Sequence, residues 1–320
     1  GEDLPSPPHT PSSKATSVPA NKAAVVSTRF ILATYGAAIG AGAWAAHCLQ
    51  SQGAVTSGLA ATLASTAVVY AGSLTSGNSS VFDPYWCLMP QGLSVWWWVT
   101  GGATGGASKA VPMALLWAWA TRFHIMLPWP GWSTGLDHED FRYLDFKKKI
   151  PSTPAYWAFS LSSFHLTPAL LVFAASIPLA RLLTSPSVPP AGRLQVISWG
   201  VACAGIAVEA VADEQLRRFK DTHRAGEVMC SGLWRYSRHP NYFGECLWWL
   251  GVYCMGSAAG VCASGWDAAG CLTMYAFFRF ASLPIMDERN VKRRGARYRK
   301  LLRTTSAFVP MPPLLDAVWA

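Results

Sequence analysis

The side chains best able to do chemistry are concentrated in residues 232 to 245, with the sequence GLWRYSRHPNYFGE. This segment supplies two guanidinium groups suited to phosphate, an imidazole, an amide, two phenols and a carboxylate. The residues are Arg235, Arg238, His239, Asn241, Tyr236, Tyr242 and Glu245. Such a set favours binding of an anion that carries a polar heterocycle.

A structural interpretation of the same segment remains open. Arginines and tyrosines at a membrane boundary serve as anchors, and Pro240 suits the first turn of a helix. Glu245 argues against this interpretation, because a carboxylate one turn into an apolar helix is costly unless it is paired or faces a polar cavity. Glu209, near the end of the preceding apolar run, raises the same question, and an ion pair with an Arg is its structural alternative.

Two further polar segments carry candidates. His138, Glu139, Asp140, Arg142 and Tyr143 fit an acid/base set, a metal site or a solvated helix start. No additional ligands occur at metal spacing, and the eight cysteines occur singly without a C-x-x-C pair, so we expect no metal. The stretch from residue 213 to 220 looks by itself like a solvated helix face.

The elements that position these residues are apolar. Hydrophobic residues make up 51% of the 320 residues and charged residues only 13%, against about 25% charged in soluble domains. Crossing a bilayer takes about 20 apolar residues. Candidate runs are Phe30 to Leu49, Ala54 to Leu74, Gln91 to Ala107, Ala110 to Leu127, Ala155 to Leu179, Leu194 to Ala212, Phe243 to Trp266 and Ala268 to Met286. We predict an all-α integral membrane protein, a bundle of about seven to eight transmembrane helices.

The domain organisation follows from composition. Residues 1–28 are rich in Pro, Ser and Thr and predict an extended or disordered tail, residues 29–310 form the transmembrane domain, and residues 311–320 are a C-terminal tail. The segments 128–154, 213–242 and 287–320 are separated by pairs of spans and must share one side, together with residues 83–86. Two of them hold most of the basic residues behind the net charge of +9, so this side is the cytoplasmic-equivalent face.

The segment GLWRYSRHPNYFGE resembles the signature of the membrane steroid 5-alpha-reductase superfamily, in its largely uncharacterised steroid-reductase-like clade. The resemblance covers roughly residues 80 to 310. It includes Asp83-Pro84-Tyr85-Trp86, Arg122, Glu139-Asp140-x-Arg142-Tyr143, Ala212-Asp213-x-Gln215-Leu216-x-x-Phe219, Arg293-Arg294-Gly295, Tyr298 and Thr305-x-x-Phe308-x-Pro310.

This resemblance implies NADPH-dependent reduction of an activated carbon–carbon double bond in a lipid or steroid-like substrate that enters from the bilayer. It places Asn241, Tyr242 and Glu245 at the nicotinamide end. It implies further cofactor contacts from Asp213, Lys220, Arg235, Arg238, His239 and Tyr298, and catalytic roles for Tyr242, Glu245 and Tyr236. No G-x-G-x-x-G turn is present, so binding in the Rossmann manner is excluded.

One departure from the family matters. The first three apolar runs lack the Glu that polarises the substrate carbonyl in characterised steroid reductases, and Trp119 or its neighbours stand about where the family has a Tyr. The proton donor therefore stays open among Asp83, Tyr85, Tyr236 and Tyr242.

Two other functions stay open. Membrane isoprenylcysteine carboxyl methyltransferases are distantly similar through a related Arg-His-Pro core and use S-adenosylmethionine. A steroid-reductase-like body can also serve as a non-catalytic subunit of a larger membrane complex. We expect membrane lipids and a lipid-like substrate as partners and no nucleic acid. The expected location is the endoplasmic reticulum or an organelle membrane, either mitochondrion or plastid.

Overall fold

The structure is a computed structural model that describes residues 26–102, 105–126, 138–224, 226–262 and 264–313. All regular structure in these residues is helical. Residues 1–25 and 314–320, which hold most of the two expected tails, lie outside the described residues. The first helix begins at Thr28, where the Ser27 hydroxyl accepts a hydrogen bond from the Phe30 N–H at 3.2 Å and caps the helix.

The first half of the chain forms four long helices. They are α1 (Thr28–Cys48), α2 (Ala54–Ser76), α3 (Tyr85–Thr100) and α4 (Gly106–Met126). α3 begins six residues before the predicted run and ends seven residues before its predicted end at 107. Gly102, Gly105 and Gly106 all have positive φ, so the glycine-rich stretch turns the chain and does not extend the helix.

The second half forms four more long helical segments. α6 (Thr153–Ser160) continues through a π-helical turn into α7 (Thr167–Thr184), and α8 (Arg193–Thr222) and α9 (Pro240–Ala258) follow. α10 (Ala269–Phe277) runs through a second π-helical turn into α11 (Leu283–Arg294). Two short helices, α5 (Phe141–Lys149) and α12 (Ala296–Thr304), lie outside these segments. α8 extends ten residues past the predicted span and carries the polar stretch 213–222 as its last turns.

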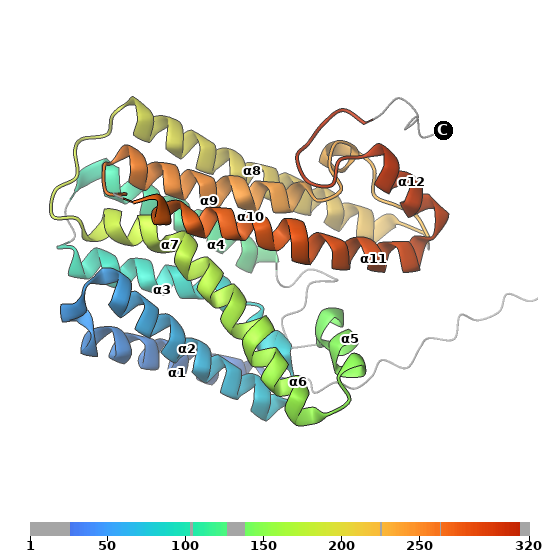
Figure 1. Cartoon of the computed structure of the whole chain (residues 1–320), viewed down its shortest axis with the longest axis horizontal. Helices are drawn as coiled ribbons and strands as arrows, with labels where there is room; N and C mark the ends of the chain where they lie inside the picture. Colours follow the sequence, from blue (N-terminus) through green and yellow to red (C-terminus); the bar gives the residue numbers. More distant parts are fainter. Residues whose placement is uncertain (1–25, 103–104, 127–137, 225, 263, 314–320) are drawn as a thin grey trace, which may run out of the picture.

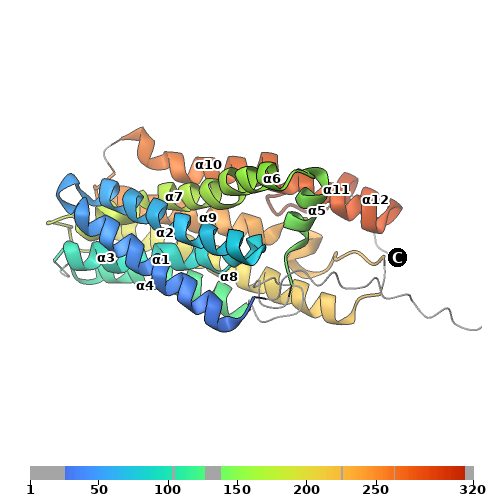
Figure 2. The ribbon, with the colours of Figure 1, turned by 90° about the horizontal axis from the view of Figure 1, so that it is seen from below.

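Four of these helical segments are long and apolar enough to cross a membrane among the residues described. They are Ala54–Ser76, Thr153–Thr184, Arg193–Thr222 and Gly265–Arg294. The protein is therefore an all-α protein of membrane type. Figures 1 and 2 show most of the long helices running roughly side by side, with α6 and the adjoining part of α7 crossing them obliquely in Figure 1 and with α5, α11 and α12 gathered at one end of the bundle.

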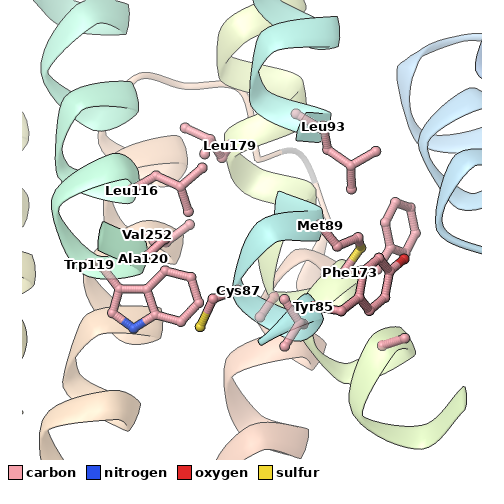
Figure 3. Packing of buried hydrophobic residues seen from close by; sticks show 14 of the residues in the cluster. Tyr85, Cys87, Met89, Leu93, Leu116, Trp119, Ala120, Phe173, Leu179 and Val252 are labelled. Carbon is pink, nitrogen blue, oxygen red and sulfur yellow. The ribbon is translucent and has the colours of Figure 1, made fainter. Parts of the chain in front are cut away.

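The bundle core consists of large apolar side chains between the helices. Trp97, Leu116, Trp119, Leu179 and Trp248 are almost completely buried. Figure 3 shows such side chains from α3, α4, α7 and α9 meeting in one apolar cluster.

Candidate functional site

The polar segments meet at one end of the bundle, as their parity predicts. The Tyr143 hydroxyl donates to Asp83 Oδ1 at 2.5 Å, which joins α5 to the start of α3. Arg289 of α11 lies 3.0 Å from the Asp145 carboxylate of α5. Arg294 donates to the backbone carbonyl of Glu227 at 2.8 Å, which joins α11 to the loop before α9. We call this region the polar end.

Glu245 lies in the first turns of α9 and is 4% exposed. Its Oε2 accepts a hydrogen bond from the Trp119 indole N–H at 2.9 Å, and its Oε1 accepts one from the Trp249 indole N–H at 2.7 Å. The aromatic packing continues outward, since Trp119 stacks on Trp248 and meets Trp86 edge to face. The predicted catalytic Glu245 is thus enclosed by tryptophans, with both oxygens engaged.

The carboxyl groups of Glu209 on α8 and Glu245 on α9 lie beside each other and interact electrostatically. Only glycine fits at position 244, because a Cβ there would lie 2.6 Å from Glu209 Cγ and 2.9 Å from the Glu209 backbone nitrogen. Gly205 is equally constrained, since a Cβ there would lie 2.5 Å from the Trp248 backbone nitrogen. The two glycines let α8 and α9 approach closely enough for their acids to meet.

Arg122, at the end of α4, joins this pair to a third acid. Its Nη2 lies 3.2 Å from Glu209 Oε2 and its Nη1 lies 2.7 Å from Asp213 Oδ2. Asp213 also accepts a hydrogen bond from the Asn241 amide at 3.2 Å. We call Arg122, Glu209, Asp213 and Glu245 the buried carboxyl cluster. It links the predicted cofactor residues Asp213 and Asn241 to the predicted catalytic Glu245.

Arg122 is the cation of the buried carboxyl cluster, and it attracts all three carboxyl groups. Lys220 is close enough to Asp213 to interact electrostatically.

Asp287 organises a second group, which we call the Asp287 group. Its carboxylate lies 2.8 Å from Arg238 Nη2 and 3.3 Å from His239 Nε2, and it accepts the Tyr298 hydroxyl at 2.6 Å. Arg238 also donates to the backbone carbonyl of Thr305 at 2.7 Å. The predicted cofactor residues Arg238, His239 and Tyr298 are therefore brought together, but their common partner is the Asp287 carboxylate of the protein itself. These contacts hold α12 and residue 305 against the start of α9.

Tyr242 and Asn241 lie between the two groups. The Tyr242 ring stacks on His239 at 5.3 Å and on Phe278 at 4.6 Å between ring centroids. Asp213 and Arg142 both lie within electrostatic reach of Tyr242. The start of α9 thus connects the buried carboxyl cluster, the Asp287 group and α5.

Asp83 is the centre of a third group, the Asp83 group, formed with Arg142 and Tyr143. Arg142 Nη2 lies 3.6 Å from Asp83 Oδ1, the oxygen that also accepts from Tyr143. Burial raises the pKa of Asp83 to about 7, against the opposing effects of Arg142 and of hydrogen bonds from Tyr143 and Ser80. Burial and then the charge of Asp83 raise the pKa of Tyr143 well above its usual value.

Basic side chains surround this end. Lys220 of α8 and Arg293 and Arg294 of α11 lie close enough for their charges to repel one another. We call these three residues the basic rim. Two predicted residues lie apart from the buried groups, since Arg235 and Tyr236 are exposed at the surface.

Sequence reasoning missed several partners. Nothing local marks Asp287 as the common partner of Arg238, His239 and Tyr298, because it lies about 50 residues from the first two. Trp119 and Trp249 were missed as donors to Glu245, although an indole needs an acceptor when it is buried, which is a usable signal. Among the described residues, no group of His, Cys, Asp and Glu lies together in a way that could hold a metal ion.

A sequence model of the DUF1295 family, described as a protein of unknown function, matches residues 69–305. The chain belongs to the DUF1295 family. The buried carboxyl cluster, the Asp83 group, the Asp287 group and the basic rim all lie within the DUF1295 match, whereas α1 and most of α2 precede it. No curated protein and no solved structure matches the chain.

Proposed function

We propose that the chain is an NADPH-dependent membrane reductase that acts on an activated carbon–carbon double bond of a lipid-like substrate. The observation that carries the proposal is the basic rim of Lys220, Arg293 and Arg294 beside Asp213 and Asn241. The resemblance of residues 232–245 to steroid reductases supports it.

The residues of the polar end fit a dinucleotide. Phosphate groups would add charge-assisted hydrogen bonds to the three cations of the basic rim, beside the carboxylates of Asp213 and Asp140 that already attract Lys220. Lys220 is near Asp213, which bonds the Asn241 amide, so the basic rim and the predicted nicotinamide contact are adjacent. The rim would hold the phosphates, and Asn241 with Tyr242 would meet the nicotinamide.

Bound NADPH would supply the hydride. The chain's own residues would orient the reactants and supply a proton. Arg122 and Asp213 hold the Asn241 amide in place. The stacked rings of His239 and Phe278 hold Tyr242 at the start of α9. The Asp287 group holds α11 and α12 against this site.

The other predicted site residues keep narrower roles in this proposal. Glu245 holds the Trp119 and Trp249 indoles in place, and Arg238 holds the Thr305 backbone carbonyl, because both charged groups are already bound to the protein. His239 and Tyr298 orient Asp287. Arg235 and Tyr236, being exposed, are proposed to contact the outer part of the cofactor.

The proposed setting is a bilayer crossed by all eight long helical segments, with the polar end on the cytoplasmic-equivalent side of an endoplasmic reticulum or organelle membrane. Exposed apolar side chains on the outer helices, such as Leu32, Ile39, Trp44 and Leu194, suit contact with lipid. The substrate would then enter from the hydrocarbon.

The experiment is a titration of NADPH against purified protein in detergent, followed by cofactor fluorescence. Lys220→Ala and Arg293→Ala should each weaken binding by about tenfold, since each removes one charge-assisted contact to phosphate. The matched control is Lys292→Ala on the same helix, where the Lys is paired with Glu288 and 70% exposed. Equal affinities in all four proteins would refute the proposed site.

The same preparation separates the alternative functions. Stabilisation by S-adenosylmethionine and not by NADPH in a thermal-shift assay would favour a methyltransferase. Stabilisation by neither cofactor would favour a non-catalytic subunit.

A further inference from the structure

Four side chains could donate a proton to the substrate, and their surroundings separate them. Tyr236 is 41% exposed. The Tyr85 hydroxyl lies 2.6 Å from the Ser65 hydroxyl and is bound within the α2 and α3 packing. The Tyr242 ring is packed between two other rings. Asp83 differs from all three in how its two carboxyl oxygens are bound.

The Asp83 carboxyl is asymmetric. Oδ1 accepts the Tyr143 hydroxyl at 2.5 Å and lies 3.6 Å from Arg142 Nη2. Oδ2 is buried and has no hydrogen-bond partner among the described residues. The residue as a whole is 8% exposed. A carboxyl with donors on one oxygen and none on the other has the arrangement of a neutral acid, whose proton sits on the second oxygen.

We infer that Asp83 is the acid that protonates the substrate, and that Tyr143 and Arg142 position its carboxyl. This inference rests on the proposed reductase function. It places the acid on the α2, α3 and α5 side of the polar end. Asn241 and Tyr242 lie on the α9 side, and Arg142 is within electrostatic reach of both Asp83 and Tyr242.

Bound NADPH would supply the hydride and be left as NADP⁺, and the hydride would form a C–H bond at the β-carbon of an enone to give an enolate. The Asp83 Oδ2–H bond breaks, a C–H bond forms at the α-carbon, and Asp83 is left as a carboxylate. Tyr143 and Arg142 then stabilise that carboxylate, because one donates to it and the other is cationic. A proton from water restores the acid.

The groups facing Asp83 support this role. Its titratable neighbours are Tyr35 of α1, Asp140 at the start of α5 and Arg142 of α5, and Tyr143 and Ser80 are its hydrogen-bond donors. Only Arg142 among them is cationic. Burial raises the pKa of Asp83 to about 7, so the acid retains its proton near neutrality, where a general acid is most effective.

The test uses Asp83→Asn in the full chain. The amide oxygen can still accept the Tyr143 hydroxyl, and the amide nitrogen takes the position of Oδ2, so the variant keeps the shape but has no acidic proton. Infrared difference spectra of the cofactor-free protein, taken across about pH 7, should show a carboxylic acid band that disappears as Asp83 ionises. The band should be absent in Asp83→Asn. A wild-type protein without this band would overturn the inference.

The second readout is NADPH oxidation with cholestenone as the enone. Asp83→Asn should lose at least about a hundredfold in rate while binding NADPH as the wild type does. Tyr143→Phe removes a hydrogen bond that lowers the pKa of Asp83, so its pH–rate profile should move to higher pH. The control Asp221→Asn removes an exposed carboxylate that is paired with Arg217, and it should leave the rate unchanged.

The outcomes distinguish two failures. An active wild type with an equally active Asp83→Asn refutes the inference and leaves the reductase function standing. A wild type that neither binds nor oxidises NADPH refutes the reductase function, and the inference falls with it.

Discussion

The carboxyl groups of Glu209 on α8 and Glu245 on α9 lie beside each other at the point where Gly205 and Gly244 bring the two helices into backbone contact. Glu245 is held from its other side by two indole N–H groups. The junction of α8 and α9 therefore combines close backbone packing with a buried pair of carboxyl groups, and its stability depends on both.

Gly244→Ala should destabilise this junction. The added Cβ would lie 2.9 Å from the Glu209 backbone nitrogen, which cannot move aside as a flexible side chain would. We expect the free energy of unfolding in detergent to fall by about 1–3 kcal/mol. Gly200→Ala on α8 is the control, because nothing lies within 4 Å of its added Cβ, and it should be neutral or slightly stabilising. Equal stability of the two variants would contradict the close packing.

Glu245→Gln should also destabilise the protein. Each carboxylate oxygen accepts one indole N–H, from Trp119 or Trp249, and an amide NH₂ cannot replace either oxygen as an acceptor. One buried donor is left without a partner, at a cost of about 1–3 kcal/mol. Thermal unfolding followed by tryptophan fluorescence measures the loss. The control is Glu214→Gln, which makes the same change from carboxylate to amide on the surface of α8. This variant should unfold like the wild type.

Asp287→Asn should loosen the C-terminal part of the site. Arg238 would lose its counter-charge, while Tyr298 and His239 would lose an ionised acceptor. We expect faster hydrogen exchange of the backbone amides in α12 and in residues 305–311, equivalent to about 1–3 kcal/mol of lost local stability. Glu288→Gln alters the next residue, whose side chain is 62% exposed, and should leave exchange unchanged. Protection of α12 that survives Asp287→Asn would argue against the Asp287 group.

Asp83 should make stability depend on pH. Its pKa is raised from 3.8 to about 7 in the folded protein, so the folded state binds more protons than the unfolded state between these values. Stability should therefore fall as pH rises from about 4 to about 7, by at least about 1 kcal/mol. Asp83→Asn, which cannot ionise, should show a flatter dependence. Melting temperatures of both proteins across this range provide the measurement, and parallel curves would show that Asp83 does not ionise as described.

Much of the fold follows from local sequence. The apolar runs locate the long helices to within a few residues, because a stretch of about 20 apolar residues is long enough to cross a bilayer. The boundaries of α3 and α8 were misplaced, and so were the ends of two later runs, because α9 ends at Ala258 and α11 at Arg294, each eight residues from the predicted end. The glycines at 102, 105 and 106 turn the chain, so α3 ends before the predicted run does. The polar residues after 212 continue α8 as a solvated extension.

The sequence by itself determined the membrane class, the order of helices and the parity that gathers the polar segments at one end. It also indicated that Asp213, Asn241 and Glu245 belong near a site. Only the tertiary structure decided that Glu245 meets Glu209, Trp119 and Trp249, and that Arg238, His239 and Tyr298 converge on Asp287. Helical spacing determines which residues share a face, but the rotation and depth at which two faces meet depend on packing. Here Gly205 and Gly244 control that packing.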